Sequence, residues 1–134
     1  MFNTGDRHIT QFDYDRLWRV AGRAGERTAA DDLENQLDRA TVVPARQVPP
    51  DVVTMNSQVE VEDLHTGNCK LITLVFPQAA DARAGNVSVL APLGVAVLGA
   101  RVGQVLDCQL PSGLRRLRVN RLLFQPEAAG HFDL

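Results

Sequence analysis

The chain of 134 residues has few cysteines, few aromatic residues and no long apolar run. Its two cysteines, Cys69 and Cys108, are too few for a disulfide framework, and a reducing compartment would keep them as thiols. No segment approaches the roughly 18 apolar residues of a membrane span, and residues 1–7 lack the basic and apolar regions of a signal peptide. We therefore expect a protein of the cytoplasm without a membrane partner.

An excess of positive charge is also missing. The chain has 14 lysines and arginines and 16 acidic residues, so its formal net charge is -2, and strong sequence-independent binding of nucleic acid is not expected. Basic residues cluster once, at Arg115, Arg116, Arg118 and Arg121. No aromatic residues that stack on bases interleave with them. We interpret the cluster as a solvated strand face that pairs with Glu60 and Glu62, the alternative being contact with phosphate or an acidic partner.

The first part of the chain shows helical periodicity in two segments. Apolar residues recur at spacings of three and four, at Tyr14, Leu17, Ala21 and Ala24 and again at Ala30, Leu33, Leu37 and Ala40. Because a short glycine-containing segment joins the two stripes, they predict a short antiparallel helical hairpin. Residues 1 to about 9 are expected to be a frayed tail, and Thr10 or Asp13 is expected to cap the first helix. Prolines end the helical signal, at Pro44, Pro49 and Pro50.

One acidic cluster, formed by Asp31, Asp32 and Glu34, could be read as catalytic carboxylates or as a metal site. Thr28 followed by Asp31 resembles a capping box, however, and acidic residues in a first helical turn interact favourably with the helix dipole. We therefore interpret these acids as capping residues of the second helix.

Beyond Pro50 the periodicity changes to that of β-strands. Val59 and Val61 alternate with polar residues, which predicts a strand with one wet face. The segment 71–76 is apolar on both faces and predicts a central strand covered on each side. Further strands are predicted at 86–90, 104–110 and 114–124, the last two joined as a hairpin.

A short helix on the sheet is expected between Pro92 and Leu98, because Pro92 suits a first helical position and Gly99 suits a C-terminal stop. The fold class is therefore α+β. We expect an N-terminal tail and short helical hairpin in residues 1–48, followed in residues 49–134 by an antiparallel sheet domain with one short helix.

Metal and nucleophile chemistry have weak support. His8, His65 and His131 with the two cysteines do not show the close ligand spacing of structural zinc sites. His65 and Cys69 flank a predicted turn, and we interpret them as a polar turn residue and a small apolar filler. No third group is placed to orient a Cys-His pair. We expect no metal, no cofactor and no enzymatic activity.

Three segments carry a family resemblance: DVVTMNS at 51–57, SVLAPLG at 88–94 and QPEAAG at 125–130. Together they resemble the bacterial nucleoside diphosphate kinase regulator (Rnk) family. The strand that leads into Ala91 and Pro92, and the short helix that Gly99 closes, also resemble the C-terminal domain of the Gre transcript-cleavage factors.

The resemblance implies a C-terminal domain with the fold of the FK506-binding-protein (FKBP) isomerases, which here binds RNA polymerase instead of catalysing proline isomerisation. The aromatic residues Phe76, Phe124 and Phe132 are too few to build an isomerase pocket. Small residues and a preset backbone at the strand-to-helix corner leave a surface that another chain could approach closely. The expected partner-binding residues are Ser88, Ala91, Pro92 and Leu93.

The predicted hairpin tip contains Arg23, Glu26 and Arg27. In the Gre factors the catalytic acids lie at the tip of a long coiled coil and hold a magnesium ion in the polymerase active centre. Here one carboxylate stands between two cations, which is a poor magnesium ligand set. The resemblance thus implies a transcription regulator that binds near the polymerase secondary channel and competes with Gre-type factors without cleaving transcripts. The alternatives are a direct partner of nucleoside diphosphate kinase and a degenerate FKBP-like peptide-binding domain.

Overall fold

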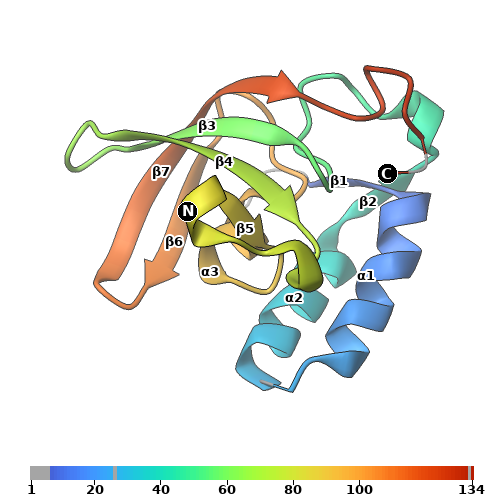
Figure 1. Cartoon of the computed structure of the whole chain (residues 1–134), viewed down its shortest axis with the longest axis horizontal. Coiled ribbons are helices and arrows are strands. Elements are labelled where there is room, and N and C mark those ends of the chain that lie inside the picture. Colours follow the sequence, from blue (N-terminus) through green and yellow to red (C-terminus); the bar gives the residue numbers. More distant parts are fainter. Residues whose placement is uncertain (1–6, 26, 133) are drawn as a thin grey trace.

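The computed structural model describes residues 7–25, 27–132 and 134. A helical hairpin lies beside a curled five-stranded sheet that carries one short helix (Figure 1). This arrangement confirms the α+β class and the order of its parts. Within the described ranges, no helix is long and apolar enough to cross a membrane.

The hairpin consists of α1 (Gln11–Arg23) and α2 (Arg27–Arg39). Thr10 caps α1, since its hydroxyl accepts a hydrogen bond of 3.1 Å from the backbone N–H of Asp13, which confirms one of the two expected caps. Five of the eight predicted seam residues are buried, at Leu17, Ala21, Ala30, Leu33 and Leu37, and the other three, Tyr14, Ala24 and Ala40, are half-buried. Each helix therefore hides its stripe, as helices of this length must in order to be stable.

The start of α2 differs from the prediction. The helix begins at Arg27, so Thr28 lies inside it and the capping-box prediction is wrong. Asp31 lies one turn further on, where its carboxylate accepts a hydrogen bond of 2.8 Å from the Arg27 guanidinium. Glu34 lies 3.5 Å from the same guanidinium. These acids thus stabilise the exposed face of α2 through ion pairs and not through its dipole.

A two-stranded parallel ribbon closes the open end of the hairpin. Strand β1 (His8–Thr10) leads into α1, and β2 (Thr41–Val43) follows α2. The predicted frayed tail is therefore wrong from Arg7 onward, and residues 1–6 lie outside the described part of the chain. Ile9 is buried, and the Arg7 guanidinium donates to the carbonyls of Ala96 at 2.7 Å and Leu98 at 3.0 Å. Three residues are too few for a readable period of two, which explains the miss.

The sheet has the strand order β5-β4-β3-β7-β6. Its strands are β3 (Gln58–Asp63), β4 (Cys69–Val75), β5 (Asn86–Ser88), β6 (Val105–Leu110) and β7 (Gly113–Phe124). The pairs are antiparallel except for β4 and β5, which are parallel, so the sheet is mixed where a wholly antiparallel one was expected. Two short 3-10 turns, Pro77–Ala79 and Ala82–Ala84, carry the chain back to start β5 beside β4.

Strand β4 is not covered on both faces as predicted. Ile72, Leu74 and Val75 are buried, but Leu71 is 45% exposed and lies opposite Glu60 on the outer face. That face is solvated over β3 and β7 as well, because their charged residues lie on it. The apolar run therefore predicted the strand, but it did not show that one face of the strand is exposed to solvent.

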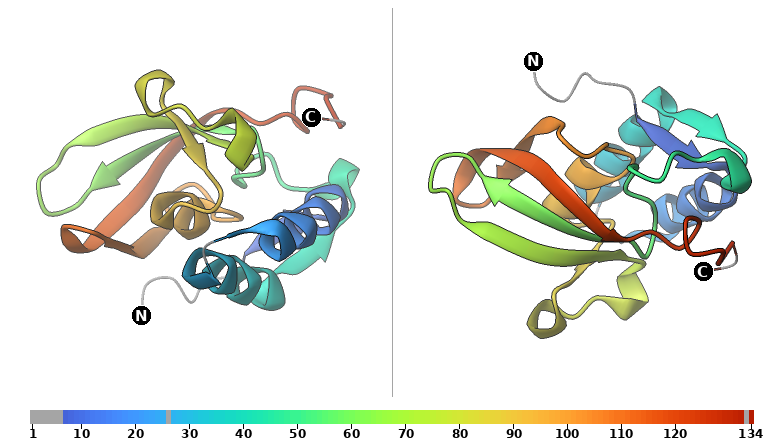
Figure 2. Two further views of the ribbon diagram at one scale, coloured as in Figure 1. Left: turned by 60° about the horizontal axis from the view of Figure 1, so that its bottom comes forward. Right: turned by 90° about the horizontal axis from the view of Figure 1, so that it is seen from above.

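Helix α3 (Pro92–Val97) begins at Pro92 and is followed by Gly99 with a positive φ of 76°, as predicted. It lies between the concave face of the sheet and the hairpin (Figure 2), and Gln36 of α2 donates to the carbonyl of Val95 at 2.9 Å. One core cluster joins the hairpin, the segment before β3, the sheet and α3, through residues such as Leu33, Met55, Val59 and Val97. The parts before and after residue 48 thus share a hydrophobic core.

Candidate functional site

The strand-to-helix corner is a tight turn held by its own backbone. The Ser88 hydroxyl accepts from the N–H of Leu90, and the Ser88 carbonyl accepts from the N–H of Ala91, both at 3.0 Å. Pro92 is exposed, whereas Ser88, Ala91 and Leu93 are half-buried. The structure therefore brings all four predicted partner-binding residues together in one ordered turn with an accessible surface.

Gly94 fixes this corner against the sheet. A Cβ placed on Gly94 would lie 2.0 Å from the Ser88 carbonyl oxygen, well inside contact distance. Helix α3 can approach the end of β5 this closely because Gly94 has no side chain. The corner backbone consequently has little freedom to move, which is a favourable property for a docking surface.

An apolar cleft of about 340 Å³ opens next to Leu93. Its apolar lining comes from β3, α3 and the β6–β7 hairpin, at Val61, Leu93, Leu110 and Leu117. Polar residues such as Lys70 and Arg115 form its rim. The cleft can accept one apolar side chain of a partner, while its rim is suited to polar contacts.

Two of the resemblance segments, 51–57 and 125–130, contact each other, and we call this contact the clasp. The amide of Gln125 donates to the carbonyls of Val52 at 2.7 Å and Pro49 at 2.8 Å. The Thr54 hydroxyl donates to the Glu127 carboxylate at 2.7 Å. Segments 51–57 and 125–130 are thus joined by hydrogen bonds, and their residue pattern is accounted for by folding.

A buried carboxylate ties α1 to the same clasp. Asp13 accepts a hydrogen bond of 3.1 Å from the backbone N–H of Met55 and forms an ion pair with Arg16. Burial raises the pKa of Asp13, although the Arg16 guanidinium opposes that shift. The sequence suggested Asp13 only as a cap, because nothing in the local pattern shows a contact with residue 55.

The hairpin tip presents exposed cations. Arg23 and Arg27 are both exposed, and Glu26 lies outside the described residues. Arg27 is already paired with Asp31 and Glu34. Among residues 7–25, 27–132 and 134, no group of three or more His, Cys, Asp or Glu side chains could hold a metal ion.

The cysteines are poor nucleophiles. Cys108 is buried, and burial raises the pKa of its thiol to about 11. Cys69 is exposed, so its prediction as a filler is wrong. Partial desolvation, followed by the carboxylates of Glu60 and Glu62, raises the pKa of Cys69. Both thiols therefore stay protonated at neutral pH.

The basic cluster of β7 is paired with acids, as predicted. Arg118 lies 2.9 Å from the Glu62 carboxylate, and Arg121 lies 3.0 Å from that of Glu60. Asn120 donates to both carboxylates, at 3.2 Å and 3.1 Å. The Asn120 hydrogen bonds, and then the arginines, lower the pKa of Glu60 and of Glu62.

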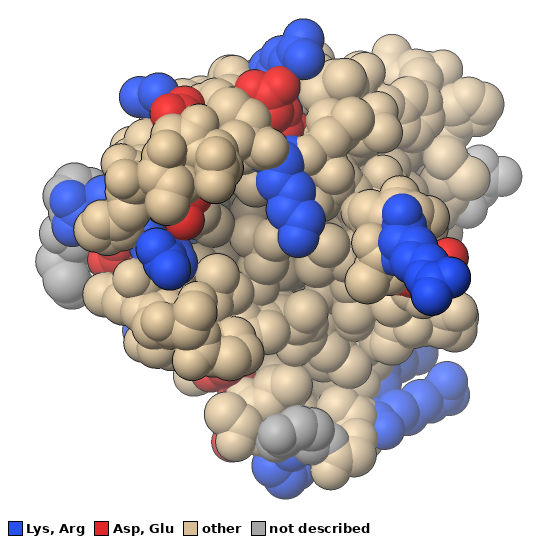
Figure 3. Space-filling model, turned by 60° about the vertical axis from the view of Figure 1, so that its left-hand side comes forward, with Lys and Arg blue, Asp and Glu red and all other residues tan. Residues whose placement is uncertain are grey.

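The other two arginines of the cluster also face acids. Arg115 lies 3.8 Å from Asp63, and Arg116 lies 3.7 Å from Asp107. The face shown in Figure 3 correspondingly has dispersed basic and acidic side chains and no continuous basic patch. Each arginine of the cluster thus has an acidic neighbour, which reduces the net positive charge of this face.

Comparison with known proteins agrees with this geometry. Residues 48–122 match the family described as "Transcription elongation factor, GreA/GreB, C-term", and residues 8–43 match "Rnk N-terminus". A solved structure titled "Prokaryotic transcription elongation factor GreA/GreB from Nitrosomonas europaea" superimposes with a TM-score of 0.74 at 33% identity, covering 90% of this chain and 100% of that chain. The sheet domain and its hairpin therefore define a Gre-related regulator.

The chain is similar both to proteins named as regulators and to proteins named as elongation factors. It is 43% identical over 106 residues to the "Regulator of nucleoside diphosphate kinase" of Escherichia coli strain K12, with 78% of each chain covered. It is 30% identical over 101 residues to the "Transcription elongation factor GreA" of Solidesulfovibrio magneticus, covering 75% of this chain and 62% of that protein. The chain belongs to the Rnk family, together with the Escherichia coli protein.

Proposed function

We propose that this protein is a cytoplasmic transcription regulator that binds RNA polymerase near its secondary channel and competes there with Gre-type factors. The observation that carries the proposal is the ordered corner at Ser88, Ala91, Pro92 and Leu93, next to a cleft that can receive an apolar side chain. Its presence in a domain of the GreA/GreB C-terminal family supports polymerase as the partner.

Replacing Ala91 with Arg tests the docking surface. The half-buried Ala91 lies just before α3, so a long cationic side chain there would prevent close approach of a partner without removing a core residue. We expect Ala91→Arg to lose most binding to purified core RNA polymerase while its thermal midpoint stays near that of wild type. The matched control is Ala128→Arg, which adds the same side chain at an exposed position in the C-terminal segment. Wild-type affinity of Ala91→Arg would move the interface elsewhere.

The second expectation is that the protein does not stimulate transcript cleavage. A hairpin whose first helix has 13 residues, at about 1.5 Å each, spans about 20 Å, and its described tip presents Arg23 and Arg27. Asp31 and Glu34 are held by Arg27 and are poorly placed to bind a magnesium ion. The test is a backtracked elongation complex incubated with this protein alone and then with a Gre factor added. Shortened transcripts in the first incubation, or undiminished Gre cleavage at saturating protein, would contradict the proposal.

A direct effect on nucleoside diphosphate kinase is the second candidate, and the name of the Escherichia coli relative favours it. Binding of purified kinase, with a change in its activity and no binding to polymerase, would support this function. A degenerate FKBP-like peptide-binding role rests on the apolar cleft beside Leu93, and capture of unstructured proline-containing proteins would favour it.

A further inference from the structure

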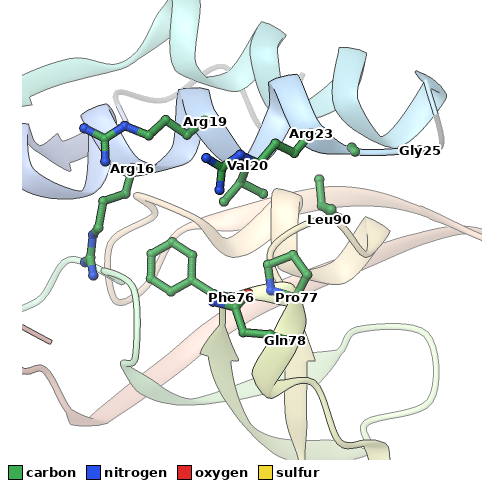
Figure 4. A pocket seen from close by; sticks show the side chains of 10 residues that line it. Arg16, Arg19, Val20, Arg23, Gly25, Phe76, Pro77, Gln78 and Leu90 are labelled. Atoms are coloured by element: carbon green, nitrogen blue, oxygen red, sulfur yellow. The ribbon is translucent and has the colours of Figure 1, made fainter.

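A second cleft, of about 530 Å³, lies between α1 and the turn that follows β4 (Figure 4). Helix α1 contributes Arg16, Arg19 and Arg23, the turn contributes residues 76–78, and Leu90 closes one end. We call it the arginine cleft. Residues of both the hairpin and the sheet domain line this cleft, and none of them lines the apolar cleft beside Leu93.

The positive charge of this cleft is only partly neutralised. Arg16 is paired with Asp13, but Arg19 and Arg23 have no ion pair or hydrogen bond in the part of the chain that the structure describes. Spacings of three and four place the three arginines on one helix face, where like charges are mutually destabilising. The helix dipole accounts for a cation in the last turn, at Arg23, but not for all three. Because three like charges on one helix face are unfavourable without a counter-ion, the arrangement favours binding of an anion from another molecule.

The floor of the cleft is apolar and one of its walls is fixed. Val20, Phe76 and Leu90 are half-buried there. The Arg16 guanidinium lies 4.6 Å from the centre of the Phe76 ring and 3.9 Å from that of Phe12. Arg16 thus holds the Phe76 ring by a cation–π contact and occupies one of its faces. A ligand for this cleft needs an apolar group as well as negative charge.

We propose that the arginine cleft binds an acidic segment of a partner protein, in which one apolar side chain lies between two carboxylates. Side chains four residues apart on a helix have Cβ atoms about 5–6 Å apart, as at Arg19 and Arg23. Alternate residues of an extended chain are about 6.6 Å apart, so an acid–apolar–acid segment matches that spacing. Because successive side chains of an extended chain point to opposite faces, the apolar side chain points away from α1 and toward Pro77 and Leu90 on the facing wall. A nucleic acid fits less well, because base stacking needs a free aromatic face, and Phe76 is half-buried with one face against the Arg16 guanidinium.

The probe is a fluorescein-labelled peptide with Glu-Leu-Glu at its centre, flanked by glycine and serine, and the readout is fluorescence anisotropy with the full chain at low salt. We expect saturable binding that weakens at least tenfold in Arg19→Gln/Arg23→Gln. The control variant is Arg39→Gln/Arg83→Gln, which removes the same charge at exposed arginines outside the cleft and is expected to bind like wild type. All four arginines are exposed, so these variants should fold.

Two further probes test the class of ligand. A Gln-Leu-Gln peptide and a Glu-Gly-Glu peptide are each expected to bind at least tenfold more weakly than Glu-Leu-Glu. Equal binding of either peptide, equal binding by Arg19→Gln/Arg23→Gln, or no binding at all would overturn the proposal. Displacement of the peptide by a short single-stranded RNA of higher affinity would also overturn it, because it would assign the cleft to nucleic acid. None of these measurements uses polymerase, so the outcome does not depend on the function proposed above.

Discussion

Glu60 and Glu62 illustrate how single residues on the outer face of the sheet contribute to stability. Their pKa values are lowered in the folded state, first by the Asn120 amide and then by Arg121 and Arg118. A carboxyl group with a lowered folded pKa contributes stability that is present above its unfolded pKa and is lost as the pH falls through the folded pKa. The network is therefore expected to weaken below about pH 4.3, the ordinary pKa of glutamate.

The variant Glu60→Gln/Glu62→Gln tests this pH dependence. We expect the stability difference between wild type and variant, measured as the midpoint of urea unfolding, to shrink as the pH is lowered from neutral to about 3. Asp13 and Glu127 have raised pKa values, which act in the opposite direction, but they are common to both proteins and cancel in the difference. A difference that stays constant over this range would show that the carboxylates are not coupled to folding.

At the scale of single elements, two helical glycines have opposite roles. Gly94 of α3 has no room for a side chain, since an added Cβ would lie 2.0 Å from the Ser88 carbonyl oxygen. Gly22 of α1 has no atom within 4 Å of such a Cβ. We expect Gly94→Ala to lower the free energy of unfolding by at least about 3 kcal/mol, and Gly22→Ala to raise it by about 0.4–1 kcal/mol. Chemical denaturation measures both, and a neutral Gly94→Ala would show that α3 can shift away from β5.

The sequence predicted the elements whose pattern is local. These elements were confirmed: the helix stripes at Leu17 and Leu33, the alternating strand at Val59 and the helix that begins at the proline of α3. Each of these patterns depends on residues that are close in sequence. Two of the misses, β1 and the direction of β5, depend on contacts distant in sequence. Strand β1 exists because His8 pairs with Thr41, a partner that three residues of sequence cannot reveal. The parallel placement of β5 likewise depends on how the two 3-10 turns direct the chain.

The candidate site shows the same division. The residues of the corner are close in sequence, so a motif could identify them, although their role in binding stays a prediction. The arginine cleft combines α1 with a turn some 50 to 60 residues further along the chain, from Val20 to Phe76 and Pro77. A spacing of three and four at Arg16, Arg19 and Arg23 was the available signal. It could not show which surface faces those arginines.

At the scale of the whole molecule, the shared core implies that hairpin and sheet unfold together. Asp13→Ala should leave the buried Met55 N–H and the Arg16 guanidinium without their partner. We expect a loss of about 3 kcal/mol, in the range for removing one member of a buried pair. The fluorescence of Trp18 in α1 and far-ultraviolet circular dichroism should still report one coincident transition.

The matched control is Asp15→Ala, which removes an exposed carboxylate of the same helix that accepts from Gln11. It should change stability by less than about 0.5 kcal/mol. If the Trp18 signal were lost at lower denaturant than the circular dichroism signal in wild type, the hairpin would be an independent cooperative unit. That result would favour the division at residue 48 as a boundary between separately folding domains.

Because the parallel ribbon of β1 and β2 fixes the base of the hairpin, the hairpin could differ in length without a change in the rest of the fold. Because His8 and Thr41 are paired, α1 begins and α2 ends at one fixed base, and the tip of the hairpin takes no part in that pairing. Seven residues added to each helix would move the tip outward by about 10 Å and leave the ribbon register unchanged. Beyond its contacts with the sheet domain, such as that of Gln36 with Val95, the hairpin could be lengthened at its tip by insertion alone.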